Sequence, residues 1–196
     1  MSEPPRWPTG DARSATGSPD PVFFRVMEDL CEQLATDLDA AFESLVGALG
    51  DDVYSGLRRM HGDAAADLTQ EAFIRAYRAL GEYDAERIRR LQLRGWIWTI
   101  ALNLGRNHVR DRSRRPQPVE LHDVHPVADP EPVDHQLWQS RLGRLTRAQR
   151  DAVVLRHVVG LDYAELATAL GRPEGTVKAD VSRGLARLRT VIEEEA

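Results

Sequence analysis

Apolar residues recur every three or four positions along most of this chain, which is the period of an amphipathic helix. Leu30, Leu34 and Leu38 begin one such run, and its continuation to Leu49 predicts a helix over residues 22–49. No stretch of useful length alternates apolar and polar residues as a half-buried strand would. The same spacing predicts further helices over residues 53–61, 64–80, 92–115, 136–144, 147–158, 163–170 and 173–192.

Residues that cap or break helices mark the expected ends of these segments. Gly50, followed by two aspartates, is expected to end the first run. Asp63 can cap the helix that ends at Gly81, and residues 82–91 are expected to form a loop. Pro116 is expected to end the long helix over residues 92–115.

The long helix over residues 92–115 combines an apolar stripe with a basic end. Trp96 lies in the stripe, so it is expected to be core rather than a base-stacking platform, while the placement of Trp98 stays open. The last turns are almost entirely arginine. The stripe consists of Leu93, Trp96, Ile97, Ile100, Ala101 and Leu104.

A proline-rich acidic segment divides the chain into two parts. Residues 116–136 contain five prolines and five acidic residues with little periodicity, which indicates a flexible linker. The expected organisation is a disordered extension over 1–21, a helical domain over 22–115, this linker, and a second helical domain over 137–196. The predicted fold class is therefore all-α, with two small helical domains.

The C-terminal part contains the signature of a helix-turn-helix. The segment GLDYAELATALG at residues 160–171 is followed by PEGTVK at residues 173–178, with Asp162 as cap and Gly171 in the turn. On the second helix, an apolar stripe is expected from Val177, Val181, Leu185, Leu188 and Ile192. The opposite face carries Thr176, Ala179, Ser182 and Arg183, flanked by Lys178 and Arg187. Small and basic residues on an exposed helix suit the major groove of DNA, although an ordinary helical hairpin with solvated charges is the alternative.

The formal net charge of −5 conceals two basic blocks. Residues 86–115 hold nine arginines against two acidic residues, and residues 141–192 hold ten basic against five acidic residues. Two such blocks indicate two contact surfaces for a polyanion, with solvated helix faces as the alternative.

Several other classes of protein find little support. No window is apolar enough for a membrane span and no signal peptide is recognisable, so the expected location is the cytoplasm, without membrane insertion. The single cysteine, Cys31, is expected to be a packing residue. The candidate ligands of a metal enzyme would lie in the proline-rich segment, where no regular structure is expected to fix their geometry. We therefore expect that the protein is not an enzyme and that it binds no metal and no cofactor. Those candidate ligands are His122, Asp123, His125, Asp129 and His135.

Two segments of the N-terminal part resemble region 2 of extracytoplasmic-function sigma factors: DLTQEAF at residues 67–73 and RGWIWTIALN at residues 94–103. The helix-turn-helix resembles region 4 of the same family. The resemblance covers about residues 38–115 and 137–192 in the family's order. Similar helix-turn-helix segments also occur in response regulators of the LuxR type. The presence of both halves in one chain is therefore what makes the resemblance specific to sigma factors.

The resemblance implies a sigma factor that directs core RNA polymerase to promoter DNA. It implies docking on the clamp helices of the largest subunit, through Asp67, Gln70, Glu71 and Phe73, and on the flap. The residues implied for the −10 element are Arg87, Arg89, Arg90, Arg94, Asn103, Arg106 and Arg110. Those implied for the −35 element are Arg172, Thr176, Lys178, Ala179, Ser182, Arg183 and Arg187. An anti-sigma factor is a further expected partner.

Three positions depart from the family's pattern. Thr99 and Leu102 stand where arginines are frequent, and Asp180 stands where the recognition helix usually has arginine. An exposed Asp180 would repel phosphate or accept a hydrogen bond from a cytosine amino group. The alternatives are a helix-turn-helix regulator that acts without polymerase, and a sigma-like protein that docks on polymerase but no longer recognises promoters.

Overall fold

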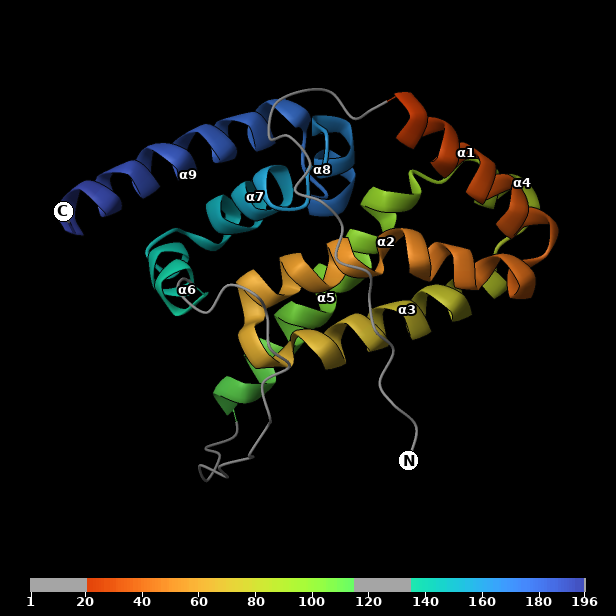
Figure 1. Ribbon diagram of the computed structural model, residues 1–196, viewed down its shortest axis with the longest axis horizontal. Helices are drawn as coiled ribbons and strands as arrows, with labels where there is room; N and C mark the ends of the chain where they lie inside the picture. The colour runs from red at the N-terminus through yellow and green to blue at the C-terminus, as the bar shows by residue number, and fades with distance from the viewer. Residues whose placement is uncertain (1–20, 115–134, 196) are drawn as a thin grey trace.

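A computed structural model describes residues 21–114 and 135–195 of the chain. The expected extension before Pro21 and nearly all of the expected linker lie outside these residues. The described residues form helices and connecting turns (Figure 1). The elements are α1 (Pro21–Thr36), α2 (Leu38–His61), the 3-10 turn η1 (Gly62–Ala64), α3 (Ala65–Gly81), α4 (Ala85–Arg89), α5 (Leu93–Arg114), α6 (His135–Gly143), α7 (Arg147–His157), α8 (Tyr163–Leu170) and α9 (Glu174–Glu195).

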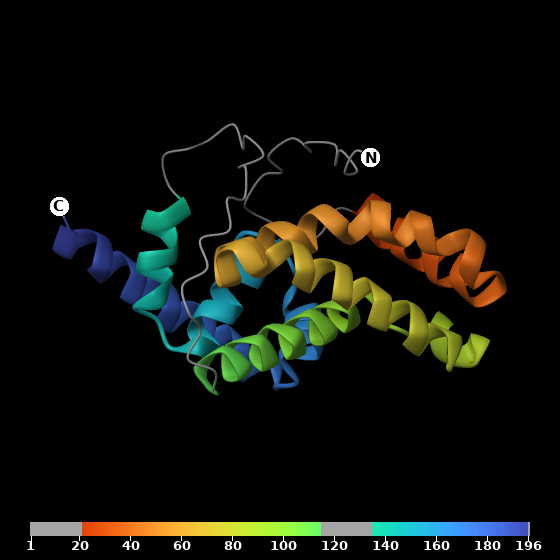
Figure 2. The ribbon, with the colours of Figure 1, turned by 90° about the horizontal axis from the view of Figure 1, so that it is seen from below.

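The N-terminal helices form a bundle in which α2, α3 and α5 pack side by side (Figures 1 and 2). Leu45 and Leu57 of α2 and Ala72 of α3 are fully buried in it, as is Ile97 of α5. The short helix α4 lies against α1 at one end of the bundle. Burial of these apolar stripes stabilises the bundle, because each buried Leu or Ile contributes about 1.5–3 kcal/mol.

The predicted break at Gly50 is wrong. Helix α2 continues through that residue to His61, and Gly50 is buried within it. The chain bends earlier, at Asp37, whose carboxylate Oδ1 accepts a hydrogen bond from the amide of Ala40 at 3.1 Å and caps α2. A glycine in a helix costs only about 1 kcal/mol relative to alanine, so packing of the continuous helix outweighs it.

Asp63 does not cap the following helix as predicted. Helix α3 begins at Ala65 without a side-chain cap, and Asp63 lies in η1. Its Oδ1 accepts a hydrogen bond from Nη1 of Arg58 at 3.0 Å. The expected loop over residues 82–91 contains α4, which Asp84 caps by accepting from the amide of Arg87 at 2.7 Å.

The bounds predicted for the first helix of the helix-turn-helix, residues 163–170, are confirmed, while the second helix begins at Glu174 and continues to Glu195, past the predicted end at residue 192. Asp162 and Glu165 form a reciprocal capping box at the start of α8, and Thr146 forms one with Gln149 at the start of α7. Gly171 ends α8 with φ +62°, a left-handed conformation that a glycine adopts without strain.

The apolar stripe of α9 is rotated from the predicted one. Leu185 and Ile192 are 37% and 39% exposed, while Asp180, Gly184 and Val191 are buried. The missing side chain of Gly184 explains this rotation, because a Cβ there would lie 2.6 Å from Cγ2 of Val153 in α7. The backbone of α9 therefore approaches α7 at a position that apolar periodicity does not detect.

One hydrophobic core crosses the boundary between the two predicted domains. Trp98 and Leu102 of α5 are buried in the same cluster as Val159, Leu161 and Leu166 of the C-terminal helices. Helix α8 packs directly on α5. The predicted all-α fold with two groups of helices is confirmed, whereas the contact between the two groups was not predicted.

Candidate functional site

The first half of α9 presents the small and basic side chains predicted to meet DNA. Ser182 and Arg183 are exposed, and Thr176 and Ala179 are half-buried beside them. Lys178 lies on α9 near the start of α8: its Nζ is 3.2 Å from Oε2 of Glu174 and 5.1 Å from the ring centroid of Tyr163. Arg187 is half-buried, with Nη1 3.6 Å from Oε1 of Glu194. This part of α9 and the turn before it form the helix-turn-helix surface.

Asp180 does not face outward from this surface as an exposed acid. It is 5% exposed, and its Oδ1 accepts a hydrogen bond from Nη2 of Arg183 at 2.7 Å. Its Oδ2 accepts from Nη1 of Arg172, which lies in the turn before α9. The expected repulsion between an exposed Asp180 and phosphate is therefore replaced by an internal ion pair with two arginines.

The two arginines of α4 and Arg90, which directly follows this helix, lie at the surface of the N-terminal bundle, and each has a partner there. The guanidinium of Arg87 lies 3.6 Å from the ring centroid of Tyr83. Arg89 donates two hydrogen bonds to Glu32 of α1, at 2.7 and 3.1 Å. Arg90 pairs with Glu86 at 2.5 Å. Exposed ion pairs of this kind contribute about 0–1 kcal/mol each, so a phosphate can replace the carboxylate at little cost.

The remaining residues predicted for the −10 element lie along α5. Asn103 and Arg110 are exposed, and Nη1 of Arg106 donates to Oδ1 of Asn103 at 3.1 Å. At 1.5 Å per residue, Arg110 lies about 24 Å along the helix axis from Arg94. The exposed basic residues thus follow α4 and the far half of α5 rather than forming one cluster.

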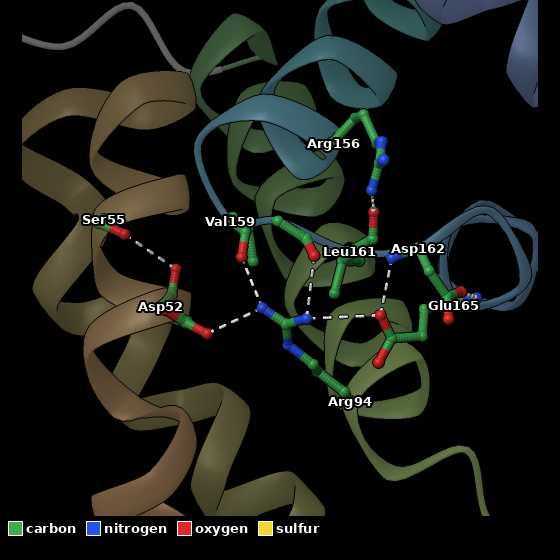
Figure 3. Close-up of polar contacts among 9 residues, drawn as sticks. Asp52, Ser55, Arg94, Arg156, Val159, Leu161, Asp162 and Glu165 are labelled. Atoms are coloured by element: carbon green, nitrogen blue, oxygen red, sulfur yellow. Dashed lines mark hydrogen bonds and ion pairs between the residues drawn. The ribbon is translucent and has the colours of Figure 1, made fainter. Parts of the chain in front are cut away.

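Arg94 is the exception, because it is buried between the two groups of helices (Figure 3). Its Nη2 is 3.0 Å from Oδ2 of Asp52 in α2 and also donates to the carbonyl of Val159. Its Nη1 lies 3.2 Å from the carbonyl oxygen of Gly160 and 3.4 Å from Oε2 of Glu165 in α8. We call these five residues the interdomain clasp. In this arrangement the Arg94 side chain is only 8% exposed, so it is not presented to DNA.

Close packing surrounds the interdomain clasp. A Cβ on Gly95 would lie 2.8 Å from the carbonyl oxygen of Glu165, so α8 touches the backbone of α5 there. Oγ1 of Thr99 donates to the carbonyl of Thr168 at 3.2 Å. Burial raises the pKa of Glu165, and the charge of Arg94 opposes that rise. Thr99 and Leu102 both lie in this contact between the two groups of helices, and they are the two positions of α5 where arginines are frequent in the family.

Sequence reasoning missed this second buried side of α5. Trp98 is 1% exposed, and it packs so closely on Gly56 that a Cβ there would lie 2.5 Å from the indole. Trp96, predicted to be core, is only half-buried and lies against Tyr83 with ring centroids 6.0 Å apart. The signal in the sequence was the spacing of Gly95, Trp98 and Leu102, which places these residues on a second apolar side of α5.

The exposed side of α3 carries the acidic residues predicted to dock on polymerase. Asp67 and Gln70 are exposed, and Oε1 of Glu71 accepts from Nε of Arg75 at 2.7 Å. Phe73, which was predicted with them, is 6% exposed and packs edge to face on Phe42. Asp67, Gln70 and Glu71 form one surface, which we call the α3 acidic face, and Phe73 belongs to the core beneath it.

The chain matches two family models in succession. The model for Sigma-70 region 2 matches residues 45–115, and the model for Sigma-70 region 4 matches residues 135–188. The chain is 33% identical over 156 residues to the RNA polymerase sigma-E factor of Streptomyces avermitilis, covering 78% of this chain and 85% of that protein. The chain belongs to the extracytoplasmic-function class of sigma-70 factors. This sigma factor is a transcription initiation factor rather than an enzyme.

Other relatives carry the same family description. The sigma factor is 36% identical over 162 residues to the ECF RNA polymerase sigma factor SigE of Mycolicibacterium smegmatis. That alignment covers 76% of this chain and 60% of SigE, so the chain spans less than two thirds of that relative. Among solved structures, CnrH in complex with the cytosolic domain of CnrY has a TM-score of 0.66 at 25% identity, covering 87% of this chain and 99% of CnrH.

Both halves of the sigma factor are needed for this assignment. The region 2 match includes the α3 acidic face and α5, and the region 4 match includes the helix-turn-helix surface. A helix-turn-helix regulator with an unrelated N-terminal half, one of the alternatives considered, does not account for the region 2 match. Every helix within residues 21–114 and 135–195 is too short or too polar to span a lipid bilayer. The same residues contain no group of three or more His, Cys, Asp or Glu side chains that could together hold a metal ion, and His122, Asp123, His125 and Asp129 lie outside them.

Proposed function

We propose that this sigma factor docks on core RNA polymerase through the α3 acidic face. The support is the exposure of Asp67 and Gln70 beside Glu71 on one side of the helix, above a well-packed core. An acidic surface of this kind pairs with basic side chains and directs the encounter of two proteins. The partner surface in this proposal is the pair of clamp helices of the largest subunit, and region 4 contacts the flap.

In this proposal the helix-turn-helix surface reads duplex DNA at the −35 element. Thr176, Ala179 and Ser182 are small enough to let α9 enter the major groove, and Arg183 and Arg187 supply contacts to bases or phosphates. Lys178 and Arg172 lie at its edges and contact the backbone. Because the net charge of the chain is −5, the affinity of the free protein for DNA is low and strongly dependent on salt.

The −10 element is captured as a single strand by α4 and α5 in this proposal. Arg87, Arg89 and Arg90 lie at one end of the basic track, and Asn103, Arg106 and Arg110 lie at the other. A basic groove that follows the backbone suits single-stranded DNA, for which exposed aromatic faces add stacking. Tyr83, half-buried beneath Arg87, offers such a face if the arginine moves to a phosphate.

The two groups of helices separate when both elements are contacted. The −10 and −35 positions are roughly 85 Å apart along B-form DNA, at about 34–36 Å per turn of 10–10.5 base pairs. In the structure α8 is in direct contact with α5, with Thr99 hydrogen bonded to Thr168. The interdomain clasp therefore opens in this proposal, which also releases Arg94 toward the −10 strand.

An anti-sigma factor is a further proposed partner. Two structures similar to this chain are complexes: CnrH with the cytosolic domain of CnrY, and RpoE with the anti-sigma factor NepR from Bartonella quintana. The RpoE structure has a TM-score of 0.61 at 25% identity, and its alignment covers 77% of this chain and 95% of RpoE. Such a partner would hold the sigma factor away from polymerase. Cytoplasmic location follows from the proposed partners, because polymerase and promoter DNA are found there.

Binding to purified core polymerase tests the docking step. Replacing Asp67, Gln70 and Glu71 together by alanine is expected to weaken binding by at least about tenfold, the loss typical of a few central interface residues. Glu43→Ala, an exposed acid on α2, serves as the control and is expected to bind like the wild type. Equal binding by all three proteins would contradict docking through the α3 acidic face.

A further inference from the structure

Asp180 has an unusual position for a charged residue of a recognition helix. The structure describes all charged residues of α9, and Asp180 is the only one of them that is buried. It lies next to Val181 at the edge of the face that packs into the C-terminal core, and Arg183 lies one turn further along the helix. The carboxylate therefore lies between the core and the exposed side of α9.

Each oxygen of this carboxylate holds a different arginine. Oδ1 accepts from Nη2 of Arg183 at 2.7 Å, and Oδ2 accepts from Nη1 of Arg172. Arg172 comes from the turn and Arg183 from the helix, so Asp180 joins the two elements of the helix-turn-helix surface. The arginine side chains remain 40% and 59% exposed, whereas that of Asp180 is 7% exposed.

The arginines keep hydrogen-bonding capacity for another partner. A guanidinium has five N–H donors in a planar fork, and one contact with Asp180 leaves the others available for phosphate oxygens or guanine edges. A buried carboxylate without its cationic partners is strongly unfavourable, so the pairs persist before DNA arrives. The arginines are thereby ordered in advance, which reduces the entropy that binding would otherwise cost.

We propose that Asp180 is a positioning residue for −35 recognition, whose buried carboxylate fixes Arg172 and Arg183 on the helix-turn-helix surface. The inference rests on the proposed function, in which this surface meets the −35 duplex. Asp180 acts through the two arginines and does not itself touch DNA.

The proposal separates sequence discrimination from affinity. Replacing Asp180 by asparagine removes a negative charge near DNA, so general attraction to any duplex rises and becomes more dependent on salt. The same change frees both arginines to adopt other rotamers. The expected result is stronger binding to unrelated DNA and weaker preference for the correct −35 sequence.

The experiment uses the full chain bound to core polymerase and a pool of promoter duplexes with a randomised −35 segment. The quantity measured is the ratio of binding to the preferred −35 sequence over binding to a scrambled one. Asp180→Asn is expected to lower this ratio about tenfold, which corresponds to loss of preorganisation at two arginines. Adding Asp180→Asn to Arg183→Gln is expected to lower it by less than the product of the two separate losses, because the residues act together.

Asp151→Asn is the matched control. Asp151 lies on α7 of the same domain, is 6% exposed, and is close to two arginines: Nε of Arg147 at 3.7 Å and Nε of Arg150 at 3.9 Å. Thermal unfolding of both variants measures any loss of stability. The control is expected to keep the discrimination ratio of the wild type.

Three results would overturn the proposal, and each has a different cause. An unchanged ratio with higher affinity for every duplex would mean that Asp180 contributes charge alone. Equal losses in Asp180→Asn and Asp151→Asn, together with lower unfolding temperatures, would mean a structural role. A wild-type protein that binds polymerase without any −35 preference would remove the proposed function of the surface, and the positioning role with it.

Discussion

His61 shows how a single residue couples the stability of this fold to pH. Its ring lies against α5, where a Cβ on Gly105 would be only 2.3 Å from Nε2. Burial, and after it the nearby groups Arg150, His108 and Arg147, together lower the pKa of His61 from 6.5 to about 4. The folded chain therefore holds this imidazole neutral at pH values where an unfolded chain would protonate it.

The free energy of unfolding is expected to fall as the pH falls from about 6.5 to about 4. In this range the unfolded chain takes up a proton at His61 that the folded chain does not, so acid favours unfolding. Urea unfolding near pH 7 and near pH 5 measures the change, and His61→Gln is expected to reduce it. His157, whose pKa burial also lowers, supplies the comparison variant His157→Gln. An unchanged pH dependence in His61→Gln would contradict the argument.

At the scale of single elements, the capping box of α7 offers a clean test of local stabilisation. Oγ1 of Thr146 accepts from the amide of Gln149 at 3.4 Å, and the amide of Thr146 donates to the Gln149 side chain at 3.2 Å. Thr146→Ala is expected to lower the free energy of unfolding by about 0.5–2 kcal/mol, measured by denaturant titration. Thr190→Ala, at an exposed threonine of α9, is expected to change it by less than about 0.5 kcal/mol. Equal effects would mean that the cap contributes nothing specific.

Sequence periodicity predicted the helices well wherever local signals decide the structure. The cap at Asp162 and the turn at Gly171 act on their immediate neighbours, and both predictions are confirmed. Gly50 was misread because its place in α2 depends on packing against other helices rather than on its own preference. The apolar stripe of α9 was predicted wrongly for a similar reason, since the absence of a side chain at Gly184 lets α7 pack closely on the backbone of α9.

The candidate site was predictable only in part. The exposed residues of the α3 acidic face and of the helix-turn-helix surface follow from helical geometry and the family resemblance. The burial of Arg94 does not, because its partners Asp52 and Glu165 lie far away in the sequence and one of them belongs to the other group of helices. The ion pairs of Asp180 escaped prediction because the helix turns that residue inward.

For the molecule as a whole, the closed arrangement depends on close contact between α5 and α8. Gly95→Ala is expected to separate the two groups of helices, because the added Cβ would lie 2.8 Å from the carbonyl oxygen of Glu165 and 3.1 Å from Cβ of Thr168. The substitution itself favours the helical conformation of α5, so the N-terminal bundle is not weakened by it. Gly47→Ala is the control, since a Cβ there meets nothing within 4 Å.

Pulsed electron paramagnetic resonance measures this separation. Spin labels at Ser44→Cys on α2 and Arg189→Cys on α9, in a Cys31→Ser background, report the distance between the two groups; both labelled positions are exposed. Gly95→Ala is expected to add a population at longer distance, and Gly47→Ala to reproduce the wild-type distribution. Identical distributions in all three proteins would show that the contact at Gly95 does not hold the closed arrangement.

Run-off transcription tests the central claim most directly. Purified core polymerase from the source organism is given a pool of its promoter fragments, with and without this chain. Specific transcripts are expected only when the chain is added, and they are expected to be lost when Asp67, Gln70 and Glu71 are replaced by alanine. Core polymerase that binds the chain yet produces no specific transcript from any promoter would contradict its role as an initiating sigma factor.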